Sequence, residues 1–383
     1  MNCDKLFETI DTLEDEYCQF LIDICNIESP TDYKQGVDAV GKYFIKKAES
    51  KGWHVEVQNQ LVSGDCVCIT LNPSSKSQSV CFSGHMDTVH PIGSFGSVPT
   101  KLDGDIIYGP GVTDCKGGIV ASFMAMDALS RLGFSSRPIK LILQSDEENG
   151  SRFSNKSTVR FMAEQAKNCL IFLNTEPCVT GRVCIATKGI RKYSFLVTGK
   201  SVHSGSCYNG ASAIAECARK IIELEKYKDE ETITCNCGLI SGGVAENIVP
   251  DKCVFTADFR FKSEKQSKIV EKIAKDVAQK SFIENTSCTL TQNSWRHCME
   301  KNEKSLVLVE KINEIFKEVG LTELREREDN GGSDAADMSF MGIPCLDGLG
   351  VLGGRIHSRE EYMYKSSLKD SAKRLASIAY LIK

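Results

Sequence analysis

Acidic and histidine side chains recur directly after short apolar runs and glycine-rich turns of this 383-residue sequence. The residues that share this placement are His85, Asp87, Asp114, Glu147, Glu148, Glu176 and His357. Imidazole nitrogen and carboxylate oxygen are the ligands that zinc and related divalent cations bind in catalytic sites. The residue types therefore predict a metal centre, provided that the fold brings them together.

Several carboxylates cannot share one pocket as bare ions, because like charges a few ångströms apart raise one another's pKa. Divalent cations remove this conflict. In one arrangement Asp114 bridges two cations, with His85 and Glu176 on the first and Glu148 and His357 on the second. The charges of two divalent cations then balance three carboxylates and one hydroxide. Zinc suits such nitrogen and oxygen ligands best, and cobalt or manganese could replace it. The residue types alone leave the pairing open.

Two further carboxylates have predicted roles beside the metal. Asp87 lies two residues after His85, on the same side of an extended chain, so it can accept the second ring N–H of that histidine. Glu147 is left over from the ligand set and is expected to act as general base and acid. Ordinary alternatives exist: Asp114 could cap the following helix, and Glu176 could be a turn residue.

The elements that must position these residues alternate between strand and helix. Apolar runs predict strands at 66–71, 79–83, 139–144 and 169–174, with a helix at about 116–131. Such an alternation favours a mostly parallel α/β sheet covered by helices on both faces. Ligands bind at the carboxyl edge of these sheets. That edge is where most of the candidate residues fall.

The middle of the chain follows a different order. Residues 189–294 read β-α-β-β-α-β, which is typical of a ferredoxin-like split βαβ unit. We therefore predict an inserted α+β domain at 189–294. The α/β catalytic domain is then formed by 1–188 and 295–383.

Composition excludes several classes of protein. A net charge of −4 without a basic tract argues against a nucleic-acid partner. The acidic amphipathic start is no secretory signal, and the sequence has no apolar run long enough for a membrane span, so we expect a cytoplasmic protein. The 18 cysteines are scattered and are expected to be mostly buried, reduced thiols. The C-x-C pairs, Cys66/Cys68 and Cys235/Cys237, lack the C-x₂-C spacing of a structural zinc site. The alternative of a disulfide-rich protein predicts few free thiols.

The motifs resemble, in order and over nearly the whole chain, those of the zinc exopeptidase and amidohydrolase family. This family includes glutamate carboxypeptidase, aminoacylase, acetylornithine deacetylase and succinyl-diaminopimelate desuccinylase, and the likeness to the glutamate carboxypeptidase branch is closest. The motifs are SGHMDTVHP, YGPGVTDCKGG, DEENGS, NTEP, GKSVHSG, ENIVP, ADFR, GGSDA and the closing His357.

The resemblance implies the two-zinc pairing described above, with Glu147 as general acid/base and Asp87 as the orienting carboxylate. It implies a cis peptide bond from Asp114 to Cys115. It also implies that the inserted domain is a lid that forms a homodimer. There His203, from a partner subunit or a closing lid, stabilises the oxyanion, and Asn247 and Arg260 hold a free carboxylate of the substrate.

The implied activity is hydrolysis of an amide bond beside a free carboxylate, in short peptides or N-acyl amino acids. One departure bears on the substrate, because Arg182 and Cys184 stand where glutamate carboxypeptidase has a lysine and a serine. This puts a glutamate preference in doubt. The alternatives are an N-acyl amino acid deacylase, a di- or tripeptidase, or a non-catalytic binding protein that kept the fold.

Overall fold

The computed structural model describes residues 3–229 and 231–383 and divides the chain into two compact units. The first unit contains Met1–Ala186, Lys301–Glu328 and Ser333–Lys383. The second contains Thr187–Glu300 and Asp329–Gly332. Every helix among the described residues is too short or too polar to cross a membrane.

A six-stranded sheet with the order β1-β2-β6-β3-β7-β14 forms the centre of the first unit. Its strands are β1 (His54–Gln58), β2 (Cys66–Leu71), β3 (Val80–His85), β6 (Ile139–Gln144), β7 (Ile171–Asn174) and β14 (Cys345–Leu346). β6, β3, β7 and β14 are parallel, whereas β2 is antiparallel to both of its neighbours. The predicted mostly parallel α/β sheet is confirmed, with β2 as its exception.

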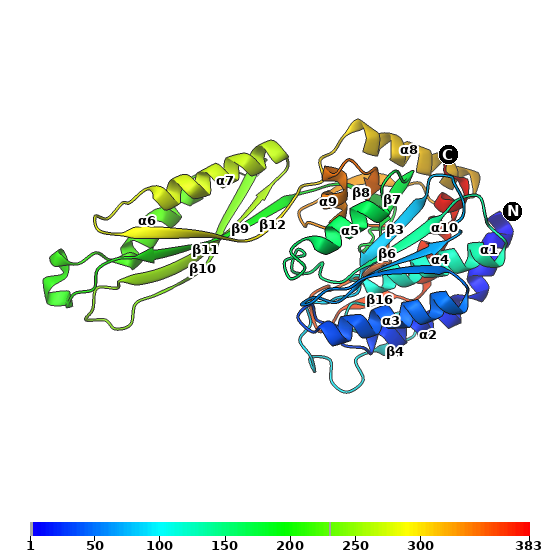
Figure 1. Ribbon diagram of the computed structural model, residues 1–383, viewed down its shortest axis with the longest axis horizontal. Coiled ribbons are helices and arrows are strands. Elements are labelled where there is room, and N and C mark those ends of the chain that lie inside the picture. Colours follow the sequence, from blue (N-terminus) through cyan, green and yellow to red (C-terminus); the bar gives the residue numbers. More distant parts are fainter. Residues whose placement is uncertain (1–2, 230) are drawn as a thin grey trace. The chain divides into compact units, whose positions relative to one another are not determined.

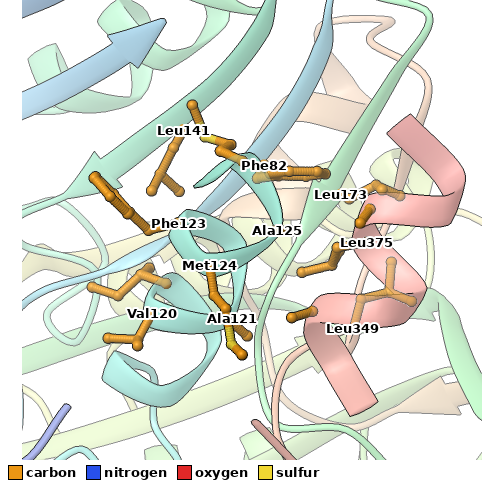
Figure 2. Packing of buried hydrophobic residues seen from close by; sticks show 14 of the residues in the cluster. Phe82, Val120, Ala121, Phe123, Met124, Ala125, Leu141, Leu173, Leu349 and Leu375 are labelled. Atoms are coloured by element: carbon orange, nitrogen blue, oxygen red, sulfur yellow. The ribbon is translucent and has the colours of Figure 1, made fainter. Parts of the chain in front are cut away.

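Helices cover both faces of this sheet (Figure 1). They are α1 (Cys3–Thr12), α2 (Glu14–Cys25), α3 (Lys34–Ser50), α4 (Lys116–Arg131), α5 (Ser157–Gln165), α8 (Glu303–Glu318), α9 (Asp334–Phe340) and α10 (Ser366–Leu381). Figure 2 shows α4 beside α10, with Phe82 and Leu141 of the sheet near α4 and Leu173 of the sheet near Leu375 of α10. Because α4 is apolar on nearly all sides, it is fixed in the core, and so is the turn that precedes it.

A second, smaller sheet in the same unit has the order β15-β16-β5-β4. Its strands are β4 (Lys101–Asp103), β5 (Ile106–Tyr108), β15 (Gly353–Gly354) and β16 (Tyr362–Tyr364). β5 and β16 are antiparallel neighbours, with Tyr108 opposite Tyr362. This pairing brings the turn after β5, which carries Asp114, beside the loop before β16, which carries His357. Strands β8 (Arg182–Thr187) and β13 (Arg325–Asp329) form a separate two-stranded sheet.

The second unit is an antiparallel sheet with the order β10-β11-β9-β12 and two helices. In chain order the elements are β9 (Gly189–Thr198), a 3₁₀ helix η1 (Ser204–Asn209), α6 (Ala213–Glu225), β10 (Ile233–Gly242), β11 (Lys252–Phe261), α7 (Glu264–Gln279) and β12 (Ser287–Arg296). Residues of β11 alternate between buried and more exposed positions, because the helices cover one face of the sheet. Phe195 and Phe255 stack in this core with ring centroids 4.6 Å apart. The predicted ferredoxin-like arrangement is confirmed.

Candidate metal centre

Three neighbouring parallel strands deliver most of the candidate residues to one edge of the large sheet. His85 is the last residue of β3, Glu147 and Glu148 follow β6, and Glu176 follows β7. Because β6, β3 and β7 are adjacent and parallel, their carboxyl ends meet at the same edge.

Asp114 reaches the same place from the turn that starts α4. The first turn of α4 lies so close to the end of β7 that a Cβ atom on Gly118 would be 2.0 Å from the carbonyl oxygen of Thr175. Only glycine permits this approach, which sets Asp114 beside Glu176. The peptide bond between Asp114 and Cys115 is cis, as predicted.

The two carboxylate oxygens of Asp114 face different partners. Its Oδ1 lies 3.1 Å from Nε2 of His85, and that nitrogen is 3.7 Å from Oε1 of Glu176. Its Oδ2 lies 3.1 Å from Nε2 of His357, which is 3.3 Å from Oε2 of Glu148. Asp114 thus stands between a His85–Glu176 pair and a His357–Glu148 pair. The grouping is the one that the resemblance implies, although the role of these residues as ligands stays a prediction.

The electrostatics of the cluster favour positive charge. Burial raises the pKa of Glu148 to about 7 and raises that of Glu176 well above its usual value. Burial lowers the pKa of His85, but the charge of Glu176 and a hydrogen bond to Asp114 outweigh it and raise that pKa strongly. Hydrogen bonds to Asp114 and Glu148 raise the pKa of His357 to about 10. Crowded carboxylates therefore attract protons onto the two imidazoles.

The donor set fits divalent cations, which could replace those protons. The ligand atoms of His85, Asp114 and Glu148 all lie within 4.8 Å of one another, and those of His85, Cys115 and Glu176 do the same. In the second group the Cys115 thiol donates to the Thr175 carbonyl at 3.0 Å, and burial raises its pKa well above the usual value. Binding a metal would cost Cys115 this hydrogen bond as well as its proton. The oxygen and nitrogen atoms thus form the better ligand set.

Asp87 is fully buried and joins His85 to the turn after β6. Nδ1 of His85 lies 2.9 Å from the Asp87 backbone carbonyl and 3.4 Å from its Oδ1, so the backbone makes the shorter contact. The Asp87 carboxylate also accepts the backbone N–H groups of Glu147 and Glu148, at 3.2 and 3.1 Å, and the Thr31 hydroxyl at 2.8 Å. It therefore orients three candidate residues, of which the sequence pattern indicated only His85.

Glu147 projects from the same turn and is 8% exposed. Its negative charge contributes to raising the pKa of both Glu148 and Glu176. The charge of Glu147 thus acts on one glutamate in each half of the cluster.

The sequence pattern did not single out Glu361, which is 1% exposed and binds the backbone of the turn that carries Asp114. Its Oε1 accepts the backbone N–H groups of Thr113 and Asp114, at 2.9 and 3.0 Å. Its Oε2 accepts the N–H of Gly111 at 3.2 Å and lies 2.9 Å from Nε2 of His90. These partners are 247–271 positions away in sequence, so no local signal could have revealed them.

The remaining predicted residues belong to the second unit. His203 is exposed and its Nδ1 accepts the backbone N–H of Gly205 at 3.1 Å, which leaves Nε2 to carry the proton of the neutral ring. The Asn247 carbonyl accepts the N–H of Ser204 at 2.9 Å. His203 and Asn247 therefore lie together, at the end of the sheet where β9 finishes and β11 begins.

Arg260 lies at the opposite end of the same sheet. It is opposite Ile190 at the start of β9, whereas Lys252 is opposite Thr198 at the end of β9. Eight residues of strand separate the two ends by about 26 Å. Arg260 also makes two hydrogen bonds to Asp258, at 2.7 and 3.1 Å. Within one chain, the structure does not bring Arg260 to Asn247.

Comparison with known proteins supplies independent evidence. The family described as "Peptidase family M20/M25/M40" matches residues 81–381. Carboxypeptidase G2 of Pseudomonas sp. (strain RS-16) is 27% identical over 353 residues, which cover 90% of this chain and 84% of that protein. A tripeptidase structure from Staphylococcus aureus has a TM-score of 0.78 and 22% identity, covering 96% of this chain and 97% of its own. An aminopeptidase structure from Bacillus cereus has a TM-score of 0.77 and 20% identity, covering 96% and 98%.

Proposed function

This chain belongs to peptidase family M20/M25/M40 and is a hydrolase, and from that premise we propose that it removes a terminal residue at an amide bond beside a free carboxylate. The substrates are short peptides or N-acyl amino acids. The observation that carries this proposal is the position of Asp114, whose two oxygens face separate His–Glu pairs. The similarity to carboxypeptidase G2 supports the same substrate class.

The proposed cofactor is a pair of Zn²⁺ ions, with Co²⁺ or Mn²⁺ as substitutes. His85 and Glu176 would hold one ion, His357 and Glu148 the other, and Asp114 both. When bound, such ions supply an activated water and a Lewis acid for the scissile carbonyl. Five candidate ligands that lie in one cluster, four of them buried or nearly so and His357 half exposed, support this assignment.

Glu147 is the proposed general base and acid. It takes a proton from the attacking water and returns it to the departing amine. Asp87 is a positioning residue, since it holds the ring of His85 and the backbone of both glutamates after β6.

His203, Asn247 and Arg260 are proposed to contact the substrate. A neutral His203 with its proton on Nε2 can donate to the developing oxyanion. The guanidinium of Arg260 has N–H groups beyond the two that bind Asp258, so it can still bind a carboxylate. Because His203 and Asn247 lie at one end of the sheet and Arg260 at the other, one substrate would meet all three only if two subunits contribute.

A homodimer through the second unit would satisfy that requirement. β10 is an edge strand that pairs only with β11 among the described strands (Figure 1). Leu239 and Ile240 on β10, and Val244 just beyond it, are 69%, 54% and 87% exposed. An apolar, unpaired edge is a surface on which a second strand can add. We propose that this edge belongs to the dimer interface.

The function is tested by replacing Glu147 with alanine. We expect kcat to fall by roughly 10²–10⁴-fold, the usual scale of general acid–base catalysis, while the number of bound metal ions is unchanged. Glu164→Ala, on the exposed face of α5, is the matched control and should retain activity. A Glu147→Ala enzyme that keeps its metal and full activity would refute the assignment.

The substrate class is resolved by a panel of dipeptides, tripeptides and N-acyl amino acids, each with a free and an amidated carboxyl end. Carboxypeptidase-like activity requires the free carboxylate in every substrate. Selective hydrolysis of the N-acyl amino acids would favour a deacylase. Activity that depends on a free amine would favour a tripeptidase. Absence of bound metal together with absence of hydrolysis would favour a binding protein.

A further inference from the structure

A cluster of two cysteines and one glutamate lies within the second unit, and none of its members belongs to the candidate centre. Cys235 and Cys237 are on β10, and Glu225 is the last residue of α6. Both sulfur atoms and one carboxylate oxygen of Glu225 lie within 4.8 Å of one another. Cys235 is 1% exposed, and Cys237 is partly buried against the same hydrophobic core.

A β-bulge helps to direct the second thiol. The register between β10 and β11 shifts between Asn236 and Leu239, so that Cys237 and Gly238 together oppose Ala257. Such bulges commonly re-aim a side chain. Here both thiols face the core side of the sheet, where α6 ends, and the two sulfur atoms lie within 4.8 Å of each other.

We propose that Cys235, Cys237 and Glu225 form a second metal site that binds a thiophilic divalent cation such as Zn²⁺. Two thiolates and one carboxylate provide three protein ligands, and solvent can occupy the fourth position of a tetrahedral ion. Sulfur ligands select softer cations than the oxygen and nitrogen ligands of the other centre. A bound cation would tie the end of α6 to the edge strand of the sheet.

The charges around the site also favour a cation. The last turn of α6 contains acidic Glu223 and Glu225 and no basic residue. Carboxylates at a helix C-terminus are unfavourable, because the helix dipole is negative there. Glu225 forms an ion pair with Lys228, 3.6 Å away, whose side chain is 63% exposed. An exposed ion pair of this kind is weak, so a divalent cation can displace the lysine.

The other C-x-C pair, Cys66 and Cys68, shows why spacing alone is insufficient. The Cys66 thiol donates to the Leu143 carbonyl at 3.2 Å, and the Cys68 thiol lies 3.9 Å from the Thr70 hydroxyl. No cluster that could hold a metal among residues 3–229 and 231–383 includes either cysteine. The third ligand from α6 is what distinguishes Cys235 and Cys237.

The full chain, purified under reducing conditions, is titrated with Co²⁺, because cobalt bound to thiolate absorbs in the near ultraviolet and cobalt bound only by oxygen and nitrogen does not. We expect this band, and a further equivalent of bound cobalt, relative to the Cys235→Ser/Cys237→Ser double variant. Glu225→Gln keeps both thiols and should weaken this binding by roughly tenfold or more, at least the effect of removing a group that supports a ligand. Since Glu225 is exposed, that variant remains informative if the double variant does not fold.

Two single variants serve as controls. Cys288→Ser, in the same unit but outside the cluster, and Cys115→Ser, beside the candidate centre, should both retain the band. The proposal is overturned if the double variant binds as much cobalt with the same band, if Glu225→Gln binds as tightly as the unmodified chain, or if mass spectrometry finds the two cysteines joined as a disulfide. Hydrolytic activity is not used as a readout, so the result is independent of the proposed function.

Discussion

Replacing Glu361 with glutamine is expected to weaken metal binding although it removes none of the proposed ligands. The amide oxygen can take the place of Oε1 and still accept the N–H groups of Thr113 and Asp114. The amide NH₂ then faces the N–H of Gly111 and the ring of His90, where Oε2 accepted before. A buried donor left without an acceptor costs about 1–3 kcal/mol.

We therefore expect the free energy of unfolding of the metal-free protein to fall by about 1–3 kcal/mol, measured by urea denaturation. The turn that holds Asp114 loosens as well, so zinc affinity should fall by roughly 10–100-fold, measured by competition with a chromophoric chelator. Glu360→Gln is the matched control, because the neighbouring Glu360 pairs with Arg355 at the surface. If Glu361→Gln lost stability but bound zinc as tightly as the control, Glu361 would be a structural residue only, and the positioning argument would be wrong.

Three further outcomes follow from the structure. Zinc affinity should rise throughout the range from about pH 6 to about pH 8 and continue to rise toward about pH 10, because the proton that His357 holds with a pKa of about 10 must leave before metal binds. Calorimetry at several pH values measures this, and a flat profile between about pH 6 and about pH 8 would contradict it. Burial raises the pKa of Asp127, but hydrogen bonds from Lys51, Arg131 and Tyr17 together outweigh it and the pKa lies below its usual value. The stabilisation is therefore complete above about pH 4 and is lost as the pH falls. Asp127→Asn should therefore cost about 1.5–3 kcal/mol at neutral pH and flatten the acid limb of a denaturation series. A Leu239→Lys/Ile240→Lys double variant should sediment as a monomer if the edge of β10 forms the dimer, and an unchanged mass would reject that interface.

Several features of the candidate site could be predicted from the sequence because they depend on local pattern. The apolar runs that end at His85, before Glu148 and before Glu176 identify parallel strands, and parallel strands bring their carboxyl ends to one edge. The direction of β2 could not be predicted in this way, because an apolar run predicts a strand without indicating which way it pairs. The contacts of Glu361 could not be predicted from the sequence either, because they depend on the pairing of β5 with β16.

The second unit gives the clearest example of this limit. Motif resemblance places Asn247 and Arg260 in one carboxylate site, and both residues are close in sequence. The strand between them is extended, however, so closeness in sequence puts them at opposite ends of the sheet. Only the register of β9 against β11 reveals this separation. Because of it, one substrate can meet both residues only if two subunits contribute to the site.

The two histidines of the candidate centre, His85 and His357, differ in how firmly the protein holds them before metal binds. His85 is 1% exposed and is held through Nδ1 by Asp87, so its ring is fixed before any ion binds. The side chain of His357 is 51% exposed. Its backbone has a φ of 61°, a left-handed conformation that residues other than glycine rarely adopt. Metal binding by His357 must therefore fix a half-exposed side chain, which costs more rotamer entropy than fixing the buried ring of His85. Asp114 connects the two halves through one rigid turn. Its support by Glu361 consequently matters most for the half whose histidine is the more exposed.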